Sequence, residues 1–150
     1  MNTPHSRFDK PVIREFERSL RADFEAAISP FIELCTPEEN VDHIRRWLRN
    51  ILMKAQPEAA ARLLECMYDI DLRPRLSEIP IPTLIIHGDA DMLPSTQLRY
   101  AEEAARLIPG SKLEIIKGAG HVPTLTRPQV VAQAISDFLD EFQESRTADG

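Results

Sequence analysis

Two short apolar stretches, each broken by glycine and each followed by a reactive side chain, constrain this chain more than any other feature. The first, Thr83–His87, is apolar and rich in branched side chains, breaks at Gly88 and is followed by Asp91. The second, Leu113–Lys117, also breaks at glycine and is followed by His121. Each stretch has the length and composition of a strand in a parallel sheet, and we expect the first to be buried on both faces.

An acid after one strand and a histidine after the next is a pattern with chemical meaning. The carboxyl ends of neighbouring parallel strands meet at one edge of a sheet, and reactive groups gather there. We therefore expect Asp91 to accept a hydrogen bond from one imidazole nitrogen of His121. The other nitrogen could then take a proton from a hydroxyl or thiol nucleophile.

The remaining chain is predicted to be helical on both sides of these stretches. Apolar residues recur every three or four positions from about Pro11, and Pro30 is expected to kink or end that first helix. Thr36 and Ser95 are expected to cap later helices, and Thr126 to open the last one. The apolar residues expected to face inward in the helix that starts at Pro57 are Ala60, Leu63, Leu64 and Met67.

These patterns divide the chain into four parts. Residues 1–10 are expected to be a flexible tail and residues 11–76 a helical region. Residues 77–143 are expected to form a strand–helix–strand–helix unit with parallel strands, which makes the fold class α/β. Residues 144–150 are polar and expected to be a second flexible tail.

Two motifs in the second half resemble the α/β-hydrolase superfamily. The stretch Ile-Pro-Thr-Leu-Ile-Ile-His-Gly-Asp-Ala-Asp-Met-Leu-Pro (81–94) resembles the strand that carries the family's acid. Gly-Ala-Gly-His-Val-Pro (118–123) resembles the loop that carries its histidine. The resemblance is close over residues 71–142, whereas residues 11–70 match only the helical character of the family's lid. It implies that Asp91 and His121 are catalytic.

The family's nucleophile motif, Gly-x-Ser-x-Gly on a strand-to-helix turn, is absent from these residues. None of the serines has glycines in that pattern; they are Ser6, Ser19, Ser29, Ser77, Ser95, Ser111, Ser136 and Ser145. We therefore expect the C-terminal half of an α/β-hydrolase fold, with a helical lid followed by the β-α-β-α unit and no nucleophile elbow.

Several candidate residues have alternative interpretations. Asp89 competes with Asp91 for the acid role but suits turn capping, and His87 is expected to be structural. A metal site formed by these three residues and His121 has no supporting spacing motif. Cys35 and Cys66 are expected to be packed thiols in a reducing cytoplasm, not nucleophiles. Three helical side chains could line a substrate pocket or belong to the core: Trp47, Met53 and Met67.

Composition excludes several classes of partner. The net charge of −6 and pI of about 5.2 provide no basic surface for nucleic acid or anionic lipid. The apolar runs are too short to span a membrane, and the first residues do not resemble a signal peptide. We expect no cofactor. The expected partners are a small-molecule ester or thioester, and an N-terminal half in trans or a second copy of the chain.

Two functions follow as hypotheses. The first is a segment of an esterase- or thioesterase-like serine hydrolase that supplies the triad acid and histidine and is inactive alone. The second is a degenerate, non-catalytic fragment that acts as an interaction module, since two strands with open edges leave apolar surface uncovered.

Overall fold

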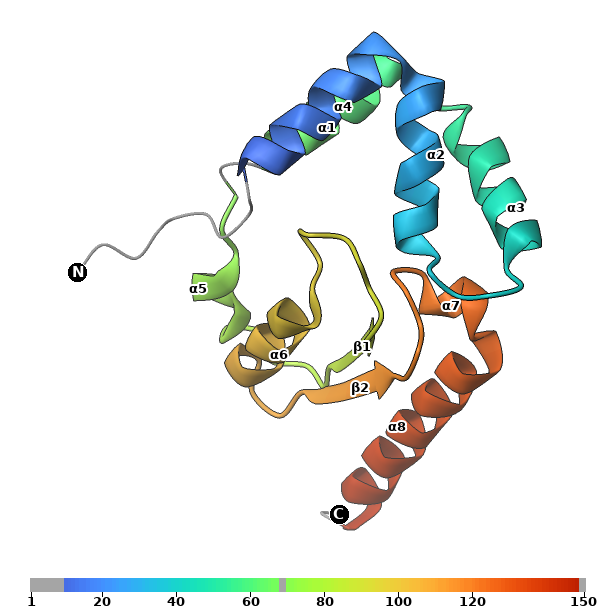
Figure 1. Cartoon of the computed structure of the whole chain (residues 1–150). Coiled ribbons are helices and arrows are strands. Elements are labelled where there is room, and N and C mark those ends of the chain that lie inside the picture. The colour runs from blue at the N-terminus through green and yellow to red at the C-terminus, as the bar shows by residue number, and fades with distance from the viewer. Residues whose placement is uncertain (1–9, 68–69, 149–150) are drawn as a thin grey trace.

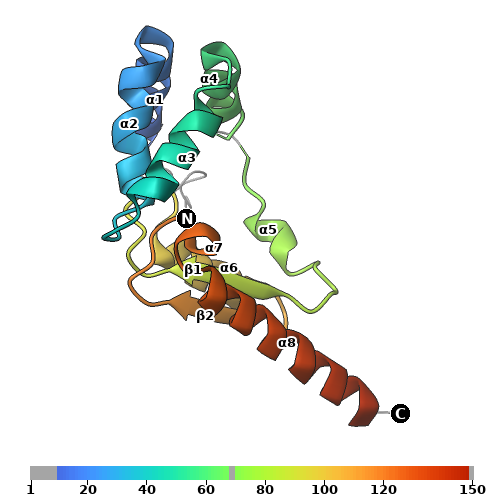
Figure 2. The same cartoon turned by 90° about the vertical axis from the view of Figure 1, so that its right-hand side faces the viewer.

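The computed structural model describes residues 10–67 and 70–148, and its elements fall into two groups (Figure 1). The first group has four helices: α1 (Lys10–Ala22), α2 (Phe24–Cys35), α3 (Asp42–Leu52) and α4 (Pro57–Cys66). The second group follows the short helix α5 (Arg73–Leu76): β1 (Leu84–Gly88), α6 (Leu98–Leu107), β2 (Lys112–Ile116), α7 (Pro123–Thr126) and α8 (Pro128–Ala148). Figures 1 and 2 show α1–α4 together on one side of the molecule and the strands with α6–α8 on the other.

The helical group is held together by an apolar core. Its buried members, Leu20, Ala27, Ile28 and Ile32, come from α1 and α2. Partly buried side chains of α1–α4 pack around them: Phe16, Phe24, Leu48, Leu52, Ala60 and Leu64. Burial of such side chains is the main stabilising contribution in a helical domain of this size.

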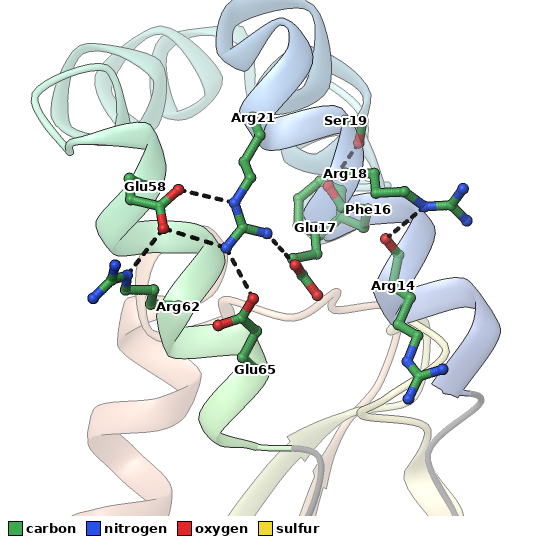
Figure 3. Close-up of polar contacts among 9 residues, drawn as sticks. All are labelled: Arg14, Phe16, Glu17, Arg18, Ser19, Arg21, Glu58, Arg62 and Glu65. Atoms are coloured by element: carbon green, nitrogen blue, oxygen red, sulfur yellow. Dashed lines mark hydrogen bonds and ion pairs between the residues drawn. The ribbon is translucent and has the colours of Figure 1, made fainter.

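An ion cluster joins α1 to α4 at the edge of this core (Figure 3). Arg21 donates to Glu58 at 2.8 Å and to Glu65 at 2.9 Å, and it also pairs with Glu17 in its own helix. These hydrogen bonds, the one with Glu58 first, raise the pKa of Arg21 above its usual value. Hydrogen bonds from Arg21 and then Arg62 lower the pKa of Glu58 to about 2.

The sheet of the described residues consists of β1 and β2, which pair in parallel with Leu84 opposite Lys112 and Gly88 opposite Ile116. Helix α6 connects them, so the expected β-α-β unit is confirmed and each strand is shifted by one residue from its predicted bounds. Both α6 and α8 pack against the two strands. A small core of Ile116, Ala119 and Val131 lies between the sheet and α8.

The prediction that the first strand is buried on both faces is wrong for this structure. Leu84, Ile85, Ile86 and His87 are only half-buried, and the two-stranded sheet explains why. A strand with a single neighbour keeps one edge open, and part of each face then stays uncovered.

The first helix breaks at Asp23 rather than at Pro30, which contradicts the prediction. Asp23 has extended backbone torsions, and its side chain accepts a hydrogen bond from the amide of Ala26, so it caps α2. Pro30 lies inside α2, where Ile28 and Ile32 on either side of it are buried. Their packing keeps the helix continuous although the proline removes one hydrogen bond.

Thr36 does not cap the next helix as predicted. It ends α2, where its hydroxyl donates to the carbonyl of Ile32 at 2.7 Å. Helix α3 begins after Val41, which provides no side-chain cap, and Asn40 reverses the chain there with a φ of 62°. Thr36 is fully buried, so its hydroxyl must bond within the protein, and the preceding turn is the nearest acceptor.

Two further predicted helix caps and two predicted core residues also differ from what the structure shows. Gln97, not Ser95, precedes α6, and the hydroxyl of Thr126 lies 3.4 Å from a carbonyl oxygen of its own turn while α8 starts at Pro128. In α4 the fully buried residue is Ala61. Leu63 and Met67, both predicted to face inward, are 69% and 42% exposed.

The two predicted tails, at the N- and C-terminal ends of the chain, lie partly outside the described residues. Helix α8 continues to Ala148, so residues 144–148 extend that helix instead of forming a tail after it. The N-terminal tail lies outside the described residues, apart from Lys10, which starts α1. No described helix is long and apolar enough to cross a membrane.

Candidate functional site

The carboxyl ends of β1 and β2 lie side by side, and the loops that leave them carry Asp91 and His121. In the first loop the amide of Asp91 donates to the carbonyl of Gly88 at 3.3 Å. In the second loop the carbonyl of Ala119 accepts the amide of Ala90 at 2.9 Å. The two loops are therefore joined by their backbones, and this joins the two side chains in space although 30 positions separate them in sequence.

Asp91 and His121 are in direct contact. Nδ1 of His121 lies 2.9 Å from Oδ2 of Asp91. A carboxylate only accepts, so Nδ1 carries the proton and Nε2 is left as the basic nitrogen of the neutral ring. The Asp91 side chain is 3% exposed and the His121 side chain is 35% exposed, so a buried acid orients a histidine that remains accessible.

Both oxygens of Asp91 have further donors. Oδ1 accepts the amide of Leu93 at 3.0 Å, and Oδ2 accepts the hydroxyl of Thr96 at 2.8 Å. These two donors hold the carboxylate of Asp91 in a fixed position beside the imidazole of His121. Thr96 was not identified from the sequence, although a hydroxyl residue in a turn five positions after Asp91 is a candidate donor to its carboxylate.

Gly88 allows the two loops to approach closely. A Cβ atom at this position would lie 2.2 Å from the carbonyl oxygen of Ala119 and 2.3 Å from that of Gly120. These distances are below any normal contact, so only glycine fits where β1 ends. The sequence indicated this role because a glycine directly follows the apolar stretch.

The two other polar residues at the end of β1 make backbone contacts. Asp89, the alternative acid, accepts the amide of Gly118 at 2.6 Å through Oδ1 and so ties the two loops together. His87 places its two ring nitrogens 2.7 Å and 2.5 Å from the carbonyl oxygens of Gly88 and Thr96. The described residues include no group of three or more side chains able to hold a metal ion, so the alternative metal site has no structural support.

The two cysteines occupy contrasting environments. Cys35 is buried, and its carbonyl accepts the amide of His121 at 2.9 Å. Burial, and secondarily the negative charge of Asp91, raises the pKa of the Cys35 thiol to about 12, which opposes a nucleophilic thiolate. Cys66 is exposed at the end of α4, so the prediction of a packed thiol is confirmed for Cys35 and wrong for Cys66.

A largely apolar cavity of about 640 Å³ lies among α1, α2, α4 and the loop after β1. Leu93 and Pro94 of that loop contribute to its wall, only two and three residues after Asp91. Met67 also lines it, whereas Trp47 and Met53 are surface-exposed and do not. Other side chains of its lining are Ile13, Phe16, Phe31, Leu34 and Leu64.

Comparisons with known proteins place the chain in a family. The chain matches the model of the alpha/beta hydrolase family over residues 4–134, and it belongs to that family. It is 30% identical over 133 residues to a pimeloyl-[acyl-carrier protein] methyl ester esterase of Photobacterium profundum, and similarly to that of Edwardsiella ictaluri. Those alignments cover 85% and 86% of this chain but 51% of each relative, so the chain spans about half the length of these curated relatives.

Solved structures agree on the fold. An esterase from Exiguobacterium antarcticum superposes with a TM-score of 0.80 at 23% identity, over 87% of this chain and 48% of that one. A bromoperoxidase from Bacillus anthracis gives a TM-score of 0.80 at 25% identity, over 91% and 51% of the two chains. These two proteins share the fold but are named for different activities, an esterase and a bromoperoxidase, so fold alone does not identify the reaction.

Proposed function

We propose that this chain is the C-terminal, acid- and histidine-bearing segment of an α/β hydrolase that cleaves esters. The observation that carries the proposal is the 2.9 Å contact between Nδ1 of His121 and Oδ2 of Asp91, with the acid buried and the imidazole accessible. Support for ester substrates comes from relatives that are named esterases at 30% identity.

In the proposed reaction, each residue has a separate role. Nε2 of His121 takes the proton of a nucleophile hydroxyl as that oxygen attacks the ester carbonyl, and Asp91 stabilises the imidazolium that forms. The imidazolium then gives the proton to the departing alcohol, which leaves an acyl-enzyme. Water, deprotonated by the same imidazole, releases the acid and restores the hydroxyl.

The nucleophile is proposed to come from polypeptide outside these 150 residues, because none of the serines in this sequence stands in a Gly-x-Ser-x-Gly turn. It could be provided by an N-terminal half acting in trans or by a longer form of the same chain. Alone, the 150 residues are then expected to be inactive.

The cavity lined by Leu93 and Pro94, in the loop that carries Asp91, supports a partly apolar acyl group. Its wall is mostly aliphatic and aromatic, and the helices that provide most of it are those expected to form a lid. Apolar pockets with a few polar groups at one end are typical of small-molecule sites. We propose esters or thioesters of medium-length acyl chains as substrates.

The test is an ester-hydrolysis assay with acetyl to octanoyl p-nitrophenyl esters. The purified chain is assayed alone and together with the protein encoded directly upstream of it. We expect activity in the mixture, and a loss of about 10³-fold or more in kcat for His121→Ala and for Asp91→Asn. Glu39→Gln, a change at an exposed site near the junction, is the control and should retain activity.

The alternative is a non-catalytic interaction module, which is favoured by the uncovered apolar surface of the strands and α8. Ile115, Val130 and Leu139 are 42%, 49% and 49% exposed. Absence of hydrolysis under both assay conditions, with the chain folded, would favour this alternative.

A further inference from the structure

The segment that joins α2 to α3 lies against the loop that carries His121. Two consecutive amides of that loop donate to it: His121 to the carbonyl of Cys35 at 2.9 Å, and Gly120 to Oε1 of Glu38 at 2.8 Å. A Cβ atom on Gly120 would lie 2.3 Å from Cδ of Pro37. The helical group therefore contacts the backbone on which His121 is mounted.

Glu38 is an unusual partner for a backbone amide in this position. It is only 6% exposed, and its second carboxylate oxygen, Oε2, is buried without a hydrogen-bond partner among the residues that the structure describes. A buried carboxylate with one unsatisfied oxygen is costly, whereas a neutral glutamine could accept the same amide at lower cost. The presence of glutamate rather than glutamine at position 38 is best explained by the stronger hydrogen bond that a charged acceptor makes to the Gly120 amide.

The backbone of this segment is itself held in place. Arg45 of α3 donates to the carbonyl of Glu38 at 3.0 Å and to the hydroxyl of Thr36 at 3.1 Å. The hydroxyl of Thr36 in turn donates to the carbonyl of Ile32 in α2. Because two helices hold the segment, the carboxylate of Glu38 can fix the position of the Gly120 amide and does not simply follow it.

We propose that Glu38 is a positioning residue for the histidine. Its carboxylate holds the amide of Gly120 and thereby keeps the next side chain, His121, aligned for its hydrogen bond to Asp91. The importance of this role for catalysis rests on the proposed function, but the alignment is a property of the 150-residue chain and is measurable without turnover.

The test uses nuclear magnetic resonance on the ¹⁵N-labelled 150-residue chain and its Glu38→Gln variant. Loss of the charge weakens the hydrogen bond, so exchange of the Gly120 amide with solvent should accelerate by roughly tenfold. The side-chain nitrogens of His121 should change from the Nδ1-protonated tautomer to a mixture with the Nε2-protonated one. A residue that only stabilised the fold would leave that tautomer unchanged.

The matched control is Glu39→Gln, the same substitution at the exposed neighbouring carboxylate. It should leave both signals at their wild-type values. If Glu38→Gln does not fold, as judged by circular dichroism, Glu38→Asp serves in its place, because it keeps the charge but is one methylene too short to reach Gly120.

Two results would overturn the proposal: signals of Gly120 and His121 that are unchanged in the Glu38 variant, or an equal change in the Glu39 variant. Neither depends on ester hydrolysis. Absence of esterase activity in every mixture would reject the proposed function. It would not affect the positioning role of Glu38, which the magnetic resonance signals of Gly120 and His121 test separately.

Discussion

The helical group α1–α4 and the strand-containing group β1–α8 are built by different means. Side chains hold the first together: a core centred on Leu20, Ile28 and Ile32, and an ion cluster around Arg21. In the second, close backbone approaches are prominent, since Gly88 lies directly against the carbonyls of Ala119 and Gly120. The candidate chemistry lies in the second group, but the first group supplies the contacts of Cys35 and Glu38 to the histidine loop.

Because they are built differently, the two groups should respond differently to substitution. Side-chain packing relaxes partly when a methyl group is lost, so α1–α4 should lose stability gradually. Backbone-to-backbone contact has no such freedom, so an added atom at the strand ends should displace the loops that carry Asp91 and His121.

The largest expected effect is a difference in thiol reactivity. Cys35 lies buried at the junction with a pKa of about 12, whereas Cys66 is exposed at the end of α4. Since only the thiolate reacts and the thiol of Cys35 is buried, Cys66 of the native chain should be alkylated at pH 8 faster than Cys35 by roughly 10³-fold. Mass spectrometry after iodoacetamide treatment measures both rates. Equal rates would mean that the junction between the groups opens in solution.

The second effect is that of an added methyl group at the end of β1. Gly88→Ala should lower the free energy of unfolding by about 3 kcal/mol, because the new Cβ has no space between two carbonyls. Gly110→Ala is the comparison: its Cβ would meet nothing within 4 Å, and its φ of 66° alone should cost about 1 kcal/mol. Urea denaturation gives both values. Similar values for the two variants would contradict the idea that backbone contact governs the strand ends.

The third effect concerns the helical core. Ile28 is 4% exposed among side chains that can close around a small gap, so Ile28→Val should cost only about 1 kcal/mol. The same substitution at Ile135, which is 43% exposed, serves as the control and should change stability less. A loss for Ile28→Val as large as that for Gly88→Ala would remove the proposed distinction between the groups.

The smallest effect is a response of the α1–α4 contact to acid. The pKa of Glu58 is lowered from 4.5 to about 2 by its hydrogen bonds to Arg21 and Arg62, so its charged form is favoured in the folded chain. The contribution of this group to stability is therefore present above pH 4.5 and is lost as the pH falls towards 2. Thermal unfolding followed by circular dichroism at several pH values should show a shallower acid response for Glu58→Gln than for the wild type.

Glu78→Gln provides the control for this measurement, because Glu78 pairs with Arg75 within one short segment and does not join two helices. Added salt should also reduce the contribution of Glu58, since the cluster is exposed to solvent and screened. An acid response of Glu58→Gln identical to the wild type would show that the cluster does not couple α1 to α4.

Elements with a strong local pattern were predictable from the amino-acid sequence. The alternation of apolar stretches, glycines and helical periods predicted both strands, their parallel order and the loops that carry Asp91 and His121. It succeeded there because the apolar stretch and the glycine break act over a few neighbouring residues. Helix boundaries at Asp23 and Val41 were predicted incorrectly, because capping competes with packing that the local sequence does not show.

Contacts between residues far apart in the sequence depend on the packing of the whole chain. Glu38 and Gly120 are 82 positions apart, and no motif relates them, yet they share a buried hydrogen bond. The placement of Thr36 at the end of a helix instead of the start of the next has the same origin, since its burial demanded the nearest acceptor. Local periodicity specifies elements, whereas the cost of burying polar groups without partners selects the contacts between them.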